Sequence, residues 1–306
     1  MRLRRGTRVL DRGDGSLQVG LRAPVMLASL SPKQRLFVER LETSHVITPL
    51  ELVRFAPLVR TLDDAGLLTP ARAEQPPRTA ALNDGGPAGM GIATALARSG
   101  WAIRLIDEGP AAASPRGTYA PAGLSSTRQA AAADTVARLV PGADVRVGAP
   151  HADVWVLISY GAAALDLAVG LMASDTPHLF VIADERGAEV GPLVIPGEGA
   201  CGMCAGYART AADPAWPVLS LQLRAPAVNP PHTSPDVAAS ISGLACGALG
   251  AWRSGDAGAW LNRTWVVTAD SPPVSRALPP APDCGCGAAG PVGDEVAARR
   301  ARFPGV

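Results

Sequence analysis

The chain has 306 residues, which is enough for about two domains. Its content of 47% apolar and 18% charged residues is typical of a globular protein and argues against disorder. A net charge of +1 gives no overall attraction to nucleic acid or to an anionic membrane. The longest apolar run, residues 161–173, is interrupted by Asp166 and is too short to span a bilayer, so we expect a cytoplasmic protein without a membrane anchor.

The first seventy residues predict a small unit of three strands and three short helices. Two strands are expected within residues 8–21, and a third at residues 24–28. Ser31 and Thr48 each precede a proline and have Gln or Glu three positions later, which is the pattern of a helix start. A third helix follows Pro57.

This arrangement is typical of a winged-helix-like unit, which we place at residues 1–70. Such units often bind DNA, but the third helix sets Arg60 against Asp63 and Asp64, which is unfavourable for contacts with phosphate. A second use of such a unit is the capture of an extended peptide as an added strand. A purely structural role remains open as well.

A change of composition separates this unit from the rest of the chain. Residues 71–78 are polar and contain prolines, so we predict a linker. A strand at residues 79–82, a glycine-rich turn and an alanine-rich helix follow, and the next strand ends at Asp107, about twenty residues on, where a nucleotide-binding βαβ unit places a ribose-binding acid. The sequence therefore predicts an α/β domain over residues 79–290, followed by a flexible tail at 291–306.

The glycine-rich turn departs from the pattern that grips a pyrophosphate. If Gly86 and Gly89 are the second and third glycines of the motif, Asp84 stands at the first position, where its carboxylate would repel the pyrophosphate. Pro87 also removes one backbone donor from the phosphate cradle. The glycines serve equally well for close packing of helix on strand, so we expect the fold without ATP binding.

The remainder of the domain alternates between helices and strands. Helices are expected at residues 125–139, 162–172 and 235–253, and strands at residues 153–158 and 260–267. This alternation continues the α/β pattern.

Four cysteines form two close pairs that lie far apart in the sequence: Cys201 with Cys204, and Cys284 with Cys286. A predicted hairpin with strands at residues 179–182 and 193–195 leads to the first pair, and a proline-rich arm at residues 272–282 leads to the second. Such pairs indicate a tetrahedral zinc site, structural because four sulfurs leave no position for water. A disulfide or unrelated cysteines are the alternatives, and a cytoplasmic location favours the metal.

Four stretches of the sequence together resemble one family. They are VLDRGDGSLQVGL, PHLFVIADERGAEVGPLVIPGEGACGMC, DPAWP and PDCGCG. With these motifs, the chain resembles the ThiF-like (ubiquitin-activating-like) cyclodehydratase or leader-peptide-binding proteins of azole-forming, bacteriocin-type peptide biosynthesis. The resemblance covers most of the chain. It implies a winged-helix peptide-recognition domain followed by a ThiF-like Rossmann-type domain with a zinc site made of four cysteines.

Adenylating relatives in this family use residues that the chain only partly keeps. They have an intact glycine loop, an arginine that reaches the phosphates and an aspartate after the fourth strand that holds magnesium. Here Arg116 or Arg128 could supply the arginine, but Ser159 and Tyr160 stand in place of the aspartate. We therefore expect a vestigial cofactor site and no catalytic residue. The vestigial set is Gly86, Gly89, Asp107 and Arg116.

The resemblance implies a non-catalytic scaffold that holds the leader of a ribosomal precursor peptide for a separate, ATP-using YcaO-type partner. The residues expected to bind the peptide are Val25, Met26, Leu27, Leu58 and Leu62. Replacing Val25 with proline is expected to remove a ladder donor and to weaken binding. The alternative is a degenerate adenylyltransferase that still uses ATP on a peptide or protein C-terminus. A homodimer remains open, since ThiF-like folds commonly pair.

Overall fold

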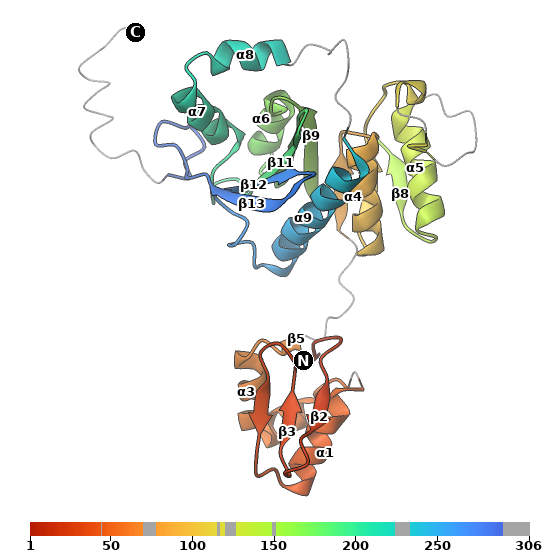
Figure 1. Cartoon of the computed structure of the whole chain (residues 1–306), viewed down its shortest axis with the longest axis vertical. Helices are drawn as coiled ribbons and strands as arrows, with labels where there is room; N and C mark the ends of the chain where they lie inside the picture. Colours follow the sequence, from red (N-terminus) through yellow and green to blue (C-terminus); the bar gives the residue numbers. More distant parts are fainter. Residues whose placement is uncertain are drawn as a thin grey trace, which may run out of the picture. The chain divides into compact units, whose positions relative to one another are not determined.

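A computed structural model describes residues 1–43, 45–69, 78–114, 117–119, 127–148, 151–223 and 233–289. The chain divides into two compact units, Met1–Pro76 and Pro77–Val306, both drawn in Figure 1. The predicted tail and, apart from Arg78, the predicted linker lie outside the described residues. None of the described helices is long and apolar enough to cross a membrane.

The first unit contains a three-stranded antiparallel sheet, a two-stranded sheet and three helices. The larger sheet has the order β2 (Val9–Asp11), β3 (Leu17–Val19), β4 (Val25–Leu27), and β1 (Arg2–Leu3) pairs with β5 (Leu68–Thr69). The helices are α1 (Pro32–Leu41), α2 (Pro49–Arg54) and α3 (Ala56–Asp64). The three strands and three helices expected from the sequence are confirmed, whereas β1 and β5 were not predicted.

Capping boxes begin the first two helices. The Gln34 backbone N–H donates to the Ser31 hydroxyl, and the Ser31 backbone N–H donates to the Gln34 side-chain oxygen. Thr48 and Glu51 make the same reciprocal pair at the start of α2. Each box satisfies N–H groups that a helix start leaves without an intrahelical partner.

The second unit is organised around one eight-stranded sheet. Its order is β13-β12-β11-β10-β9-β6-β7-β8. The strands are β6 (Thr79–Leu82), β7 (Ala102–Leu105), β8 (Val145–Val147), β9 (Val154–Tyr160), β10 (His178–Ala183), β11 (Gly187–Val194), β12 (Arg263–Thr268) and β13 (Ser271–Ala277). Strands β10, β9, β6, β7 and β8 are parallel, and the hairpin of β10 and β11 opens an antiparallel extension.

Helices cover both faces of this sheet. They are α4 (Pro87–Arg98), α5 (Arg128–Leu139), α6 (Leu165–Ala173), α7 (Gly202–Ala212), α8 (Trp216–Leu223) and α9 (Pro235–Ser254). Alternate residues of β10 serve the two faces: Val181 belongs to the core under α4 and α9, and Phe180 to the core under α6 and α7. Figure 1 shows α4 and α9 side by side.

The strand order places a ligand-binding position of α/β folds between β6 and β9. The chain proceeds from β6 to β7 and β8 on one side, and then returns to β9 and β10 on the other. In open α/β sheets, ligands bind beyond the carboxyl ends of the strands at such a reversal. The glycine-rich turn follows β6, so it lies where a nucleotide would be sought.

The prediction of a proline-rich arm at residues 272–282 is wrong for the first half of that segment. Ser271–Ala277 forms β13, which pairs antiparallel with β12 at the edge of the sheet. An edge strand tolerates proline because one of its sides needs no ladder donor, and Pro272 and Pro273 lie in this strand. Strand β8 and helices α7 and α8 were also not predicted.

Candidate functional site

The four cysteines of the two sequence pairs meet in space. Cys201 is the N-cap of α7, Cys204 lies in the first turn of that helix, and Cys284 and Cys286 follow β13. Their four sulfurs all lie within 4.8 Å of one another. The sulfur–sulfur distances are 3.9 Å for Cys201–Cys204, 3.6 Å for Cys201–Cys284 and 3.7 Å for Cys204–Cys286. We refer to these residues as the cysteine cluster.

The geometry of the cysteine cluster fits one tetrahedral ion. Four sulfurs bonded at about 2.3 Å to a tetrahedral zinc ion lie about 3.8 Å apart, close to the distances found here. A disulfide would need a sulfur–sulfur bond of about 2.0 Å, which the same distances exclude for these pairs. The Ala281 amide nitrogen lies 3.4 Å from the Cys204 sulfur, so a backbone donor also supports the cluster.

The thiol pKa values of the cluster shift in different directions. Desolvation raises the pKa of Cys201 and that of Cys284 above the ordinary value. For Cys286, burial opposes ionisation, but the Ala288 backbone and the neighbouring thiols donate hydrogen bonds that lower its pKa. A divalent cation would overcome the cost of ionising the buried thiols, because it binds the thiolate form.

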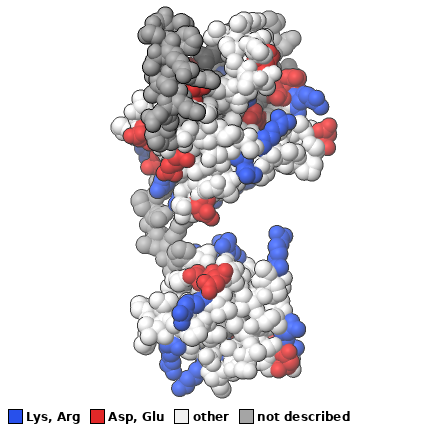
Figure 2. Space-filling model, turned by 90° about the vertical axis from the view of Figure 1, so that its left-hand side faces the viewer, with Lys and Arg blue, Asp and Glu red and all other residues white. Residues whose placement is uncertain are grey.

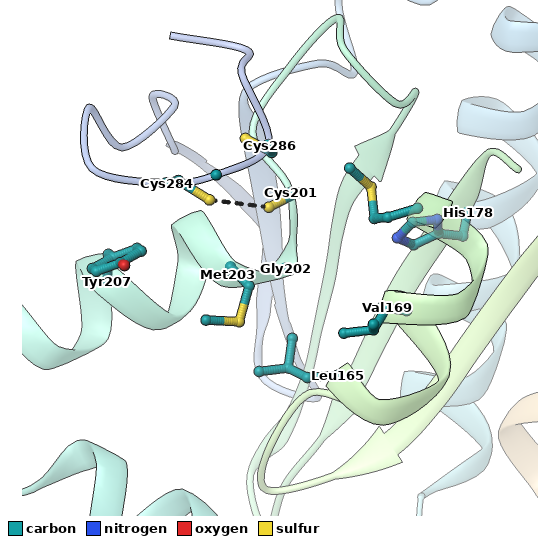
Figure 3. Close-up of a pocket in the computed structure, with 12 residues that line it drawn as sticks. Leu165, Val169, His178, Cys201, Gly202, Met203, Tyr207, Cys284 and Cys286 are labelled. Carbon is teal, nitrogen blue, oxygen red and sulfur yellow. Dashed lines mark hydrogen bonds between the residues drawn. The ribbon is translucent and has the colours of Figure 1, made fainter. Parts of the chain in front are cut away.

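An apolar groove of about 230 Å³ adjoins the cysteine cluster. Its walls include Leu165 and Val169 of α6 and Met203 and Tyr207 of α7, as Figure 3 shows. His178 lies at its end as the first residue of β10; its Nδ1 is 3.0 Å from the Thr176 carbonyl oxygen. Burial lowers the pKa of His178, so the ring is neutral, and it packs edge-on against Phe180. This histidine has the features of a core residue.

The glycine-rich turn holds a carboxylate of its own chain. The amide nitrogen of Gly86 donates to Asp84 Oδ1 at 3.0 Å, and that of Gly89 donates to Asp84 Oδ2 at 2.9 Å. Asp84 is buried, and its pKa is raised chiefly by desolvation. Two of the N–H groups at the start of α4, where a phosphate would bind, are therefore bound to a side chain.

Gly89 serves packing at this turn. A Cβ atom at Gly89 would lie 1.9 Å from the Asp84 carbonyl oxygen, far inside any real contact. The absence of a side chain allows the helix to approach the strand end closely, which is one of the uses of glycine in such turns. Both glycines of the predicted cofactor set thus contact Asp84.

Asp107 is likewise bound to its own chain. Its carboxylate accepts from the amide nitrogens of Gly85 at 2.9 Å and Gly109 at 3.0 Å. The Arg128 guanidinium lies 2.7 Å away in an ion pair, and this hydrogen bond raises the pKa of Arg128. The predicted ribose acid and one of the two predicted phosphate arginines therefore neutralise each other, while Arg116 lies outside the described residues.

The end of β9 brings no carboxylate to the strand reversal. Ser159 and Tyr160 occupy the last two positions of the strand. Burial raises the pKa of Tyr160 to about 12, so its hydroxyl stays protonated. With the turn amides and Asp107 already bound, the described residues do not fit the phosphates of a nucleotide.

The residues predicted to bind a peptide fall into two groups. Val25, Met26 and Leu27 form β4, an edge strand that pairs with β3 alone among the described strands. Leu58 and Leu62 are buried in the core of the first unit, with 9% and 0% of their surface exposed. The helix stripe that suggested a binding surface is therefore the packing face of α3, and these two side chains offer no surface to a peptide.

Two features of the site were missed in the sequence. The self-bound carboxylate was one of them, although an aspartate two residues before a glycine is a signal for an Asx turn, in which the side chain accepts from the backbone N–H two residues on. The other was the apolar groove beside the cysteine cluster, for which the sequence carries no local signal because its walls come from separate helices.

Sequence comparison gives no relatives: no protein-family model and no curated protein matches the chain. Solved structures do match. E. coli MccB with AMPCPP and selenomethionine MccA has a TM-score of 0.63 at 15% identity, covering 94% of this chain and 99% of MccB. The microcin C7 biosynthetic enzyme MccB in complex with N-formylated MccA gives 0.60 at 14% identity, with coverages of 93% and 98%. Selenomethionine PaaA gives 0.59 at 12% identity, with coverages of 90% and 99%. The chain therefore has the overall fold of MccB and PaaA over nearly its whole length.

Proposed function

We propose that the protein is a leader-peptide-binding scaffold that presents a ribosomal precursor peptide to a separate, ATP-using YcaO-type cyclase. The fold supports a role with peptides, because 93–94% of the chain matches MccB, which has been solved in complex with MccA. The proposal of a non-catalytic role is supported by the Asp84 carboxylate, which binds the amides of Gly86 and Gly89 that a nucleotide would need. The scaffold would thus leave ATP chemistry to its partner.

The open edge of β4 is the proposed peptide site. Gly20 N donates to Arg8 O, and Arg12 N donates to Ser16 O, so even-numbered residues of β3 direct their backbone groups toward β2. Backbone direction alternates along a strand, so Leu17 and Val19 face β4. Their partners Leu27 and Val25 use their own N–H groups in that ladder, which leaves the N–H and C=O of Met26 for an added strand.

This register corrects the test expected from the sequence. Proline at Val25 would break the ladder inside the sheet, and it would damage folding rather than peptide binding alone. Proline at Met26 removes the donor on the open edge, where a strand tolerates proline. Met26→Pro is therefore the informative variant, and Met26→Ala is its control because it keeps the backbone donor and removes the half-exposed side chain.

The experiment measures leader-peptide affinity of the full chain by fluorescence anisotropy. Met26→Pro is expected to weaken binding by about tenfold or more, the effect of one lost backbone hydrogen bond and a disturbed edge, and Met26→Ala by much less. An unchanged melting temperature would show that Met26→Pro is folded. Equal affinity of wild type and folded Met26→Pro would contradict binding at this edge.

We also propose that the cysteine cluster holds a structural zinc ion. The four sulfurs supply a complete tetrahedral set, so the ion would have no open position for water or substrate. The ion would tie residues 284–286 to the start of α7 and thereby fix the chain beyond β13 against the domain.

The alternative function is a degenerate adenylyltransferase that acts on a peptide or protein C-terminus. It is favoured by the likeness to E. coli MccB solved with ATP, at 15% identity. Saturable binding of Mg·ATP by the purified chain would support this alternative. The proposal includes a cytoplasmic location and leaves open whether the chain forms a homodimer.

A further inference from the structure

A second surface of the first unit has the features of a docking site. A groove of about 320 Å³ lies between helices α1 and α2. Side chains of both helices line it, and no residue of strand β4 does. Leu36 of α1 and Leu50 of α2 line it with 58% and 75% of their surface exposed. Helix α2 buries none of its residues, although three of its six are leucine or valine. An apolar helix that buries nothing within its own unit is unusual.

The floor of the groove is rigid and aromatic. Phe37 and Phe55 stack with ring centroids 4.3 Å apart, and both are buried. The Arg54 guanidinium lies over the Phe55 ring at 5.6 Å. The stacked rings lie beneath the groove and support its walls, so the exposed leucines supply the apolar contact surface.

The rim of the groove is positively charged. Lys33, Arg40 and Arg54 line it, together with one carboxylate, Glu51. Both Glu51 oxygens are already used: Oε2 accepts from the Thr48 N–H and hydroxyl, and His45 Nε2 lies 3.0 Å from Oε1 and 2.8 Å from Oε2. Arg40 approaches Glu51 only at 3.7 Å, and no ion pair of Lys33 or Arg54 is found among the described residues. Lys33 and Arg54 are therefore the cations that the rim offers to a partner.

The whole first unit is more basic than the rest of the chain. Residues 1–69 contain eleven Arg and Lys and seven Asp and Glu, whereas the complete chain has a net charge of +1. Figure 2 shows basic side chains prevailing over acidic ones on the face of this unit turned to the viewer. The field of the unit thus favours an acidic partner.

We propose that the groove between α1 and α2 docks an acidic amphipathic helix of a partner polypeptide. Two apolar side chains of the helix, spaced one turn apart, would cover Leu36 and Leu50 over the Phe37 floor. Carboxylates flanking them would pair with Lys33 and Arg54. Nucleic acid is less suitable, because phosphates would leave the exposed leucines without an apolar partner.

The first test measures binding of a defined probe to the full-length protein. The probe is an N-acetylated, lysine-free helical peptide of about sixteen residues, with leucines at helical spacing and glutamates beside them. A peptide with glutamine for every glutamate is its control. We expect saturable binding of the acidic peptide, weakened at high salt, and at least about tenfold weaker binding of the glutamine peptide.

Variants locate the site. Leu36→Glu and Leu50→Glu each remove an apolar contact and repel the probe, and each is expected to weaken binding about tenfold or more. Both residues are exposed, and Glu at position 36 has Arg40 one turn later, so folding should be preserved. Leu139→Glu changes another exposed leucine, in the other unit, and should leave affinity unchanged. Met26→Pro should also keep this binding, which separates the groove from the edge of β4.

Cross-linking gives an independent readout, because Lys33 is the sole lysine of the chain. A carbodiimide should join a probe carboxylate to Lys33 as an amide, and Lys33→Arg should abolish this product while keeping the affinity. The proposal would be overturned if the acidic peptide did not bind, or if both leucine variants bound it as tightly as wild type. It would also be overturned if a DNA or RNA oligonucleotide displaced the peptide and its binding depended on Leu36 and Leu50.

Discussion

At the scale of one residue, Asp84 determines what the glycine-rich turn can bind. Its two carboxylate oxygens accept from Gly86 and Gly89, and Arg128 is held nearby by Asp107. The sequence suggested that a carboxylate here would repel a pyrophosphate. The structure adds that the carboxylate takes the place of the anion, because helix N-termini bind negative groups of either kind.

Removing this carboxylate should create an anion site. In Asp84→Ala the amides of Gly86 and Gly89 lose their acceptor, and sulfate can replace it. Sulfate at a few times its dissociation constant should then raise the free energy of unfolding of the variant by about 1 kcal/mol. Thermal unfolding with sulfate, compared with chloride at equal ionic strength, measures the effect. An equal gain in wild type would contradict it, since there the amides are occupied.

Glu51 predicts a loss of stability in acid. Hydrogen bonds from the Thr48 backbone and from His45 lower the pKa of Glu51 to about 2, below its ordinary value of 4.5. The stabilisation is therefore complete above pH 4.5 and is lost as the pH falls toward 2. Glu51→Gln should remove this part of the pH dependence and cost at most about 1 kcal/mol at neutral pH. Unfolding curves between about pH 7 and pH 2 that are parallel for both proteins would contradict the assignment.

At the scale of elements, local signals were sufficient where capping and turns determine the structure. The two capping boxes, the hairpin of β10 and β11 and helix α9 were predicted from such signals. Strand β13 was missed because its prolines suppress strand propensity, and only its place at a sheet edge makes them acceptable. Leu58 and Leu62 pack in the core because their face of α3 is turned inward. The apolar stripe of a short helix does not tell whether that stripe is buried in the core or exposed to a ligand.

The start of α4 predicts a sharp contrast between two glycines in helices. Gly89→Ala places a Cβ 1.9 Å from the Asp84 carbonyl oxygen, so the helix must move away from β6. We expect a loss of about 3 kcal/mol or more in the free energy of unfolding. Gly206→Ala in α7 meets nothing within 4 Å and should instead stabilise by up to about 1 kcal/mol. Chemical denaturation measures both, and similar effects of the two changes would contradict the close approach at Gly89.

At the scale of the whole molecule, the cysteine cluster joins segments about eighty residues apart. Its four members could be named from spacing alone, because two close thiol pairs far apart in a sequence are a known pattern of sites with four cysteine ligands. The groove between α1 and α2 could not be foreseen in the same way. Its walls come from two helices, so the groove exists only when both helices are packed in the folded unit.

Loss of one thiol of the cluster should release the ion and weaken the fold. We expect about one zinc per chain in wild type and much less in Cys201→Ser, with a loss of several kcal/mol in stability. Cys246→Ser is the matched control: Cys246 is half-buried outside the cluster, and burial raises the pKa of its thiol to about 11. Elemental analysis with thermal unfolding measures both. Full zinc content in Cys201→Ser would contradict the assignment.

ATP–pyrophosphate exchange tests the central claim most directly. The full chain, loaded with zinc, is incubated with Mg·ATP and labelled pyrophosphate, with and without a leader-bearing precursor peptide. Asp84 occupies the amides of Gly86 and Gly89, and Asp107 occupies the Arg128 guanidinium, so these groups are not available to the phosphates of a nucleotide. We therefore predict no exchange above a protein-free control in either case. Peptide-dependent exchange by wild type that is lost on heating would contradict this prediction and would assign adenylation to this chain.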